Sequence, residues 1–98
     1  MRKIKDLINH EKRVYILLKT KAIRYRFMSD AEREGITFSD GVSPLDRMVE
    51  DVMSLRSDGT ICFLGFAGRI YMHHRKDITL VDYEKYIEGE EGGVNFPM

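Results

Sequence analysis

The chain has 98 residues, and its 16 lysines and arginines balance 16 aspartates and glutamates. This size predicts one small globular domain, and the neutral balance lacks the basic surplus typical of nucleic-acid-binding domains. No apolar run approaches the roughly 18 residues of a membrane span, and residues 1–9 lack the apolar stretch of a secretion signal, so we expect a cytoplasmic protein without membrane contact.

Two short elements are expected at the start of the chain. Residues 3–9 repeat apolar positions at helical spacing, which predicts a short amphipathic helix. Residues 13–18 are apolar on both faces of an alternating pattern. Because strands covered on both sides usually lie inside a sheet, this segment is expected to be an internal strand.

The main helix has the clearest boundaries in the sequence. Thr20 can cap its N-terminus, Gly35 can end it, and neither Gly nor Pro interrupts residues 20–34. One stripe of the helix carries apolar residues every four positions, namely Ile23, Phe27 and Ala31. Residues 36–38 read as a short strand, so residues 13–38 predict a β-α-β unit with parallel strands and a right-handed crossover.

A hairpin is expected in the middle of the chain. Asp58 and Gly59 form the dipeptide that favours a two-residue type I′ turn, and they separate residues 52–57 from residues 60–66. The first arm alternates apolar and polar residues, as a half-exposed strand does. Residues 61–64 are apolar on both faces, which predicts a position inside the sheet.

The other elements are shorter. Ser43 and Pro44 suit the N-cap and first position of a helix that runs to about residue 51. Residues 69–76 fit either a strand or a helical turn, and the conformation of residues 67–77 stays open. Residues 78–82 read as the last strand.

These elements predict an α/β fold, with α+β as the alternative. We expect a mixed sheet of about five strands that contains the β-α-β crossover and the hairpin, with the main helix packed on one face. Residues 1–87 form the single domain. Residues 88–98 are acidic and rich in glycine, so they are expected to form a flexible tail.

No combination of residues in the sequence matches a known catalytic or metal site. His73 and His74 are adjacent, so on a strand they point to opposite faces, and a shared metal would need a loop and a carboxylate such as Asp77. Apolar neighbours of Cys62, the one cysteine, predict a buried and unreactive thiol. We therefore expect no catalytic residue, no metal and no cofactor, and an enzyme that uses His73 or His74 remains a third hypothesis.

Two further groups of residues have a simpler structural interpretation. Asp46 and Glu50 are spaced to lie one turn apart on a helix, next to Asp51, which predicts an exposed acidic face. Gly65 to Arg69 form a glycine-containing connection whose backbone amides could hold an anion, but it lacks both phosphate-binding fingerprints.

Basic residues are concentrated at the start of the chain. Residues 1–33 hold ten lysines and arginines against four aspartates and glutamates. Nucleic-acid binding through this half is an alternative function, and its candidate residues are Lys21, Arg24, Arg26 and Arg33. They are distributed over both flanks of the main helix, which favours a solvated surface over a phosphate-binding track.

Three segments resemble a group of small uncharacterised proteins encoded in phages and integrative elements of Gram-positive bacteria. The segments are AEREGITFSDG at residues 31–41, DGTICFLGF at residues 58–66 and DYEKY at residues 82–86, and the resemblance extends over about residues 13–90. It implies an accessory protein of a mobile element, with no catalytic residues to transfer. It also favours binding to a protein or interference with a host process.

We therefore expect a small non-enzymatic module that binds a protein partner. The candidate surface is the exposed flank of the main helix, where Arg24, Tyr25 and Met28 combine residue types common at protein interfaces. Nucleic acid is the alternative partner.

Overall fold

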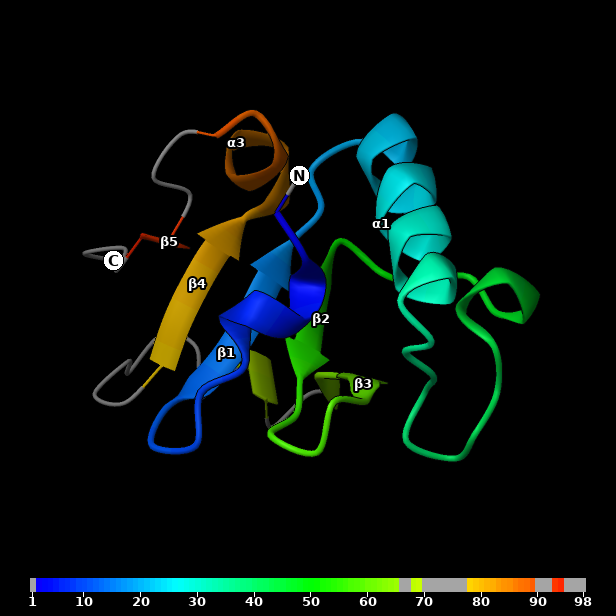
Figure 1. Cartoon of the computed structure of the whole chain (residues 1–98), viewed down its shortest axis with the longest axis horizontal. Helices are drawn as coiled ribbons and strands as arrows, with labels where there is room; N and C mark the ends of the chain where they lie inside the picture. The colour runs from blue at the N-terminus through cyan, green and yellow to red at the C-terminus, as the bar shows by residue number, and fades with distance from the viewer. Residues whose placement is uncertain (1, 66–67, 70–77, 90–92, 95–98) are drawn as a thin grey trace.

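A mixed β-sheet organises the chain in the computed structural model, which describes residues 2–65, 68–69, 78–89 and 93–94 (Figure 1). The strand order is β3-β2-β1-β4-β5. The neighbours β1 and β4 are parallel, and all other neighbours are antiparallel. The strands are β1 (Arg13–Leu17), β2 (Val52–Leu55), β3 (Ile61–Phe63), β4 (Ile78–Asp82) and β5 (Gly93–Val94). The fold is therefore α+β, and β5 adds only a two-residue pairing to four longer strands.

The main helix, α1 (Lys21–Arg33), has the predicted boundaries. The Thr20 side chain accepts a hydrogen bond from the Ile23 N–H at 3.1 Å. At the other end, the Gly35 and Ile36 N–H groups donate to the carbonyls of Glu32 and Ala31, which is the Schellman arrangement. Gly35 has a φ of 76°, a backbone conformation that favours glycine over residues with a Cβ.

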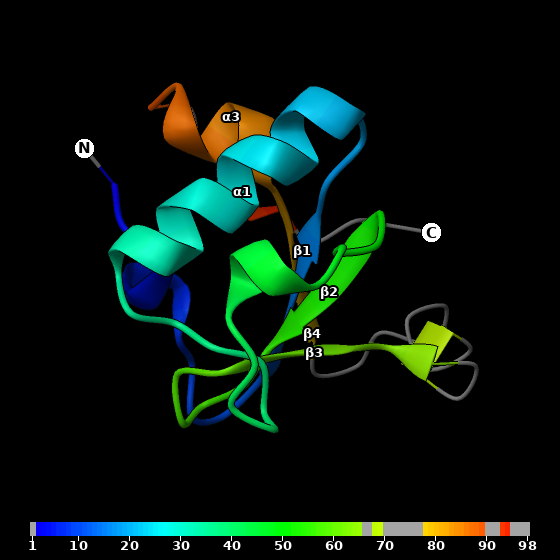
Figure 2. The same cartoon turned by 90° about the vertical axis from the view of Figure 1, so that its right-hand side faces the viewer.

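The core lies between α1 and one face of the sheet. The predicted helix stripe is buried, and Phe27 is completely inaccessible. The sheet contributes alternate residues to the same cluster, including Val14, Ile16, Met53 and Val81. A second helix, α3 (Tyr83–Ile87), lies beside α1, and both are visible in Figure 2. The Phe27 and Tyr83 rings meet edge to face, with centroids 5.2 Å apart.

The opposite face of the sheet carries a smaller apolar cluster. Alternation along the strands turns Tyr15, Val52, Ile78 and Leu80 away from α1, and all four are buried. The expected internal position of the strand at residues 13–18 is confirmed, because β1 has neighbours on both edges.

The expected β-α-β pairing is wrong. Residues 36–38 do not pair with β1, whose neighbours are β2 and β4. Instead, Phe38 forms a single parallel bridge to Ile61. Three residues can make few ladder hydrogen bonds, so β2 and β4 provide the more extensive pairing for β1.

The hairpin of β2 and β3 is confirmed, but two of its details were wrong. The Arg56 N–H donates to the Thr60 carbonyl, so three residues, and not two, form the turn. Only Gly59 in this turn needs a positive φ, of 86°, as in a type I turn followed by a bulge. β3 lies at the edge of the sheet, which leaves Cys62 half-buried and Phe63 39% exposed.

The two short helices are single 3-10 turns, η1 (Ile4–Leu7) and η2 (Pro44–Asp46). Ser43 caps η2 as predicted, but the helix ends at Asp46 and does not reach residue 51, because Arg47 is extended with a φ of −147°. Within the expected tail, residues 93–94 pair with β4. No helix in the described part of the chain has the length and apolar character to cross a membrane.

Candidate functional site

The surface predicted for a protein partner is not formed as expected. Tyr25 is exposed at 56%, and Arg24 is half-buried with its Nε donating to the Leu18 carbonyl at 3.1 Å. Met28 is only 4% exposed and belongs to the core. The expected exposure of Met28 was therefore wrong, and the three residues do not form one continuous accessible flank.

Residues 43–51 explain the burial of Met28. The Ser43 hydroxyl donates to the Glu32 carboxylate near the end of α1, and the Leu18 N–H before α1 donates to the Asp51 carbonyl at 2.6 Å. This segment therefore runs along one flank of α1 and shares the core cluster with Met28 through Val49. The sequence gives no signal for this covering because the segment has little regular structure.

The four basic residues predicted for nucleic acid have separate environments. Arg26 Nε lies 3.0 Å from a carboxylate oxygen of Asp30, and Arg33 lies 3.4 Å from the other oxygen. Arg24 contacts the Leu18 carbonyl, and Lys21 is exposed at the start of α1. Two of the four charges are thus directed to one acidic side chain, which weakens the case for a phosphate-binding track.

Asp30 belongs to a buried polar cluster between α1 and α3. It is 5% exposed, and the Tyr83 hydroxyl donates to its carboxylate at 2.5 Å. Burial and the hydrogen bond to Asp30 raise the pKa of Tyr83 well above its usual value, so the hydroxyl stays protonated and can donate. The cluster satisfies its own charges and is a structural link between the two helices.

The residues predicted for metal binding or catalysis are only partly described. His73, His74 and Asp77 lie outside the described residues. The described part of the chain contains no group of three or more His, Cys, Asp or Glu side chains that could hold a metal ion. Asp46 and Glu50 do not share a helix face, because η2 ends at Asp46.

Arg69 already has acidic partners. Its guanidinium lies 2.8 Å from Asp51 and 3.6 Å from Glu50. The hydrogen bond from Arg69 lowers the pKa of Asp51, while the same contact raises the pKa of Arg69. This pairing argues against an anion site that uses Arg69 at the end of the glycine-containing connection.

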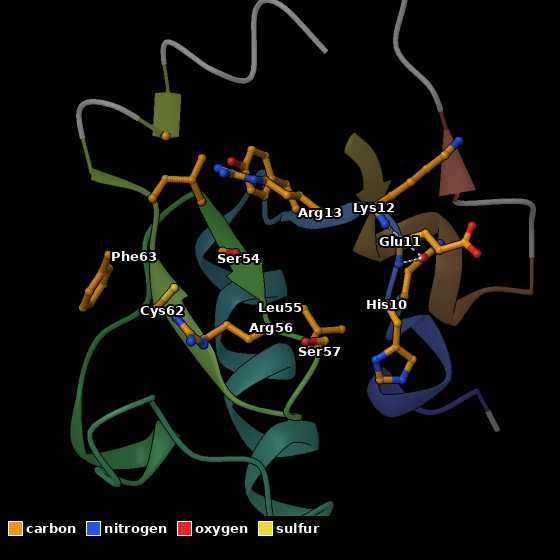
Figure 3. Close-up of a pocket in the computed structure, with 14 residues that line it drawn as sticks. His10, Glu11, Lys12, Arg13, Ser54, Leu55, Arg56, Ser57, Cys62 and Phe63 are labelled. Carbon is orange, nitrogen blue, oxygen red and sulfur yellow. Dashed lines mark hydrogen bonds between the residues drawn. The ribbon is translucent and has the colours of Figure 1, made fainter. Parts of the chain in front are cut away.

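A different site lies on the sheet face that points away from α1. It is an open depression of about 840 Å³, which we name the sheet-face basin. The basin is lined by residues 9–13, Tyr15, residues 54–57, residues 62–64 and Gly68. Its floor comes from β1, β2 and β3, and one rim comes from the loop before β1 (Figure 3).

The strand register brings two arginines together on this floor. Val14 of β1 faces Leu55 of β2, and this register, extended by one residue past the end of β2, places Arg13 opposite Arg56. Both therefore share a face with Tyr15, which pairs with Ser54. Figure 3 shows Arg13 and Arg56 turned toward β3, with Ser54 between them and the Arg56 side chain reaching toward Cys62.

The rim adds further basic groups. The Asn9 side chain accepts hydrogen bonds from the N–H groups of Glu11 and Lys12, at 2.8 and 3.0 Å, and this turn positions His10 and Lys12 at the basin. Among the lining residues that the structure describes, Glu11 alone is acidic. Asp58 lies 3.7 Å from Arg56, but both side chains are more than half exposed, so water screens this pair.

Comparison of the chain with protein-family models, curated proteins and solved structures finds no significant match in any of the three. The resemblance to mobile-element proteins therefore stays a prediction. The chemistry of the basin is therefore the guide to the function of the chain.

Sequence reasoning missed the sheet-face basin. Arg13 and Arg56 are separated by more than forty positions, and nothing in the sequence indicates that their strands are neighbours. The available signal was the position of each arginine at the end of an alternating strand. That signal becomes informative only when the strand order is known.

Proposed function

We propose that the protein is a small non-enzymatic binding module that holds an acidic segment of a partner protein in the sheet-face basin. The observation that carries this proposal is the placement of Arg13 opposite Arg56 on the floor, with Lys12 and His10 at the rim and Glu11 as the single acidic side chain among the described lining residues. Carboxylates accept paired hydrogen bonds from guanidinium groups, which makes an acidic peptide the complementary ligand.

A bound acidic segment is attracted by the guanidinium groups that Arg13 and Arg56 carry on one face of the sheet. The strand register that places both side chains on this face exists only in the folded protein, so such a ligand binds the folded state in preference to the unfolded chain. The partner is therefore expected to stabilise the folded protein as well as to bind it.

A protein partner fits the basin better than single-stranded nucleic acid does. Binding of unpaired bases relies on exposed aromatic rings on which the bases stack. In the described lining, Tyr15 is only 2% exposed, and Phe63 belongs to the other face of its strand. The described part of the basin thus offers charge and hydrogen bonds but no exposed tyrosine or phenylalanine ring on its floor for bases to stack on.

Charge reversal on the basin floor tests the proposal. We expect a fluorescently labelled peptide of alternating glutamate and glycine to bind the wild-type protein, and the glutamine version of the peptide to bind much more weakly. The double variant Arg13→Glu, Arg56→Glu should lower the affinity by about tenfold to a hundredfold, since each reversal replaces attraction by repulsion. Fluorescence anisotropy at several salt concentrations measures the effect.

The matched control is Lys21→Glu combined with Lys85→Glu. Both lysines are exposed and neither lines the basin. Because two cationic side chains become anionic in each double variant, the control has the same net charge as the test variant. It should retain most of the affinity. Equal losses in both double variants would show a general charge effect, and tighter binding of an oligothymidylate than of the acidic peptide would favour nucleic acid.

A further inference from the structure

One stretch of the β3 edge has backbone groups directed outward. The Ile61 N–H donates to the Thr37 carbonyl at 3.0 Å, and its carbonyl accepts from the Ser39 N–H at 2.9 Å. These bonds cover the edge at Ile61. The chain then turns away, because the Gly41 N–H donates back to the Phe38 carbonyl and Gly41 adopts a φ of 91°.

Phe63 repeats the orientation of Ile61 two positions further along β3. In an antiparallel pair, alternate residues direct their N–H and C=O groups toward the partner strand and away from it. The backbone N–H and C=O groups of Ile61 point away from β2, so those of Cys62 point toward β2 and those of Phe63 point away from it again. No backbone hydrogen bond joins these outward groups of Phe63 to another described residue.

We propose that the acidic partner segment binds as an added strand along the β3 edge beside Phe63, with acidic and apolar residues in alternation. This inference rests on the proposed function, because the basin supplies the charge that selects the partner. Strand addition of this kind gains affinity from main-chain hydrogen bonds and specificity from alternate side chains.

The two faces of β3 explain the alternation. On the basin face, the Arg56 side chain reaches toward Cys62 (Figure 3). Every second side chain of an added strand would lie on this same face, on which the Arg56 guanidinium lies. On the other face, the Phe63 ring is 39% exposed and packs on Phe38 at a centroid distance of 5.4 Å. The Arg47 guanidinium covers the Phe38 ring at 4.8 Å, which leaves Phe63 as the apolar contact.

Phe63→Pro tests the main-chain hydrogen bond that the Phe63 N–H would donate to the added strand. Phe63→Pro removes an outward N–H that the described sheet does not use, whereas Phe63→Ala removes the ring and keeps the N–H. With a peptide of alternating glutamate and valine, we expect Phe63→Pro to bind about threefold to tenfold more weakly than Phe63→Ala. Equal affinities of the two variants would overturn strand addition.

Modified peptides give a second measurement that does not depend on the folding of the proline variant. In an added strand, residues of one parity direct their N–H groups to β3. N-methylation of either the valines or the glutamates should therefore abolish binding for one set and leave it nearly unchanged for the other. Equal binding of both methylated peptides would contradict the inference.

The two proposals fail in different ways. If a peptide with its glutamates in one block binds as well as the alternating peptide, and Arg13→Glu with Arg56→Glu still weakens binding, strand addition is wrong but the basin function stands. If neither peptide binds, both proposals are wrong.

Discussion

Phe27→Ala is expected to cause a large loss of stability in this protein. The ring is completely buried between α1 and the sheet, and it meets Tyr83 edge to face. Truncation of a buried phenylalanine removes transfer free energy and leaves a cavity, which together cost about 3–5 kcal/mol. Small domains have a total stability of about 5–15 kcal/mol, so this loss removes between about a fifth and all of it, and the variant should unfold at a clearly lower urea concentration than the wild type.

Urea denaturation followed by circular dichroism measures this loss. Phe27→Leu keeps part of the volume and should lose less, which provides a measurable value if the alanine variant does not fold. Ser29→Ala, on the exposed side of the same helix, should change the free energy of unfolding by less than about 0.5 kcal/mol. A loss below about 1 kcal/mol for Phe27→Ala would contradict the described core.

Asp30→Ala should produce the second large effect. The substitution leaves the buried Tyr83 hydroxyl without its acceptor, and it removes the carboxylate that Arg26 and Arg33 contact. An unsatisfied buried hydroxyl costs about 1–3 kcal/mol, and the two arginines are exposed enough to be solvated instead. We expect a loss of about 2–3 kcal/mol in the free energy of unfolding.

A double-mutant cycle separates the hydroxyl from the rest of the cluster. Asp30→Ala combined with Tyr83→Phe removes the orphaned hydroxyl, so the double variant should be more stable than the sum of the single losses predicts. Additive losses would show that Tyr83 and Asp30 do not interact as described.

The Tyr83–Asp30 pair also predicts how the free energy of unfolding changes at alkaline pH. The pKa of Tyr83 is raised by burial and by Asp30, above the ordinary tyrosine value of about 10. Unfolding above that pH releases a proton, so the stabilisation is complete below pH 10 and declines as the pH rises further. Tyr83→Phe should lose less stability above pH 10 than the wild type does. Tyr86, whose pKa is also raised, is present in both proteins.

Local signals account for the parts of the fold that the sequence predicted correctly. Thr20 and Gly35 act within a few residues of α1, and the hairpin turn brings together segments that are adjacent in the chain. The buried stripe of α1 follows from helical spacing alone. Each of these features depends on interactions over a short sequence distance.

The order of the strands could not be predicted in this way. β1 pairs with β2 and β4, which lie far along the chain, whereas residues 36–38 form a single bridge to β3 and do not pair with β1. The position of β3 at the sheet edge follows from that order and exposes Cys62 and Phe63, which have an apolar sequence context. The burial of Met28 likewise depends on an irregular segment that covers α1.

The candidate site depends on the same long-range order. Arg13 and Arg56 acquire a common face only because β1 and β2 are neighbours in one particular register. A register shift by one residue would turn one of the arginines to the other face. The candidate surface at Arg24, Tyr25 and Met28 was predicted from residue type alone. Residue type does not show which side of α1 is covered by another segment.

A charge-swap experiment tests the central claim, that the basin recognises acidic side chains, most directly. The variant Arg13→Glu, Arg56→Glu should lose the glutamate-glycine peptide and gain affinity for the corresponding lysine-glycine peptide, while the Lys21→Glu, Lys85→Glu control keeps the wild-type preference. We expect the ratio of the two affinities to reverse in the basin variant alone. An unchanged ratio in the basin variant, or the same reversal in the control, would contradict recognition by Arg13 and Arg56.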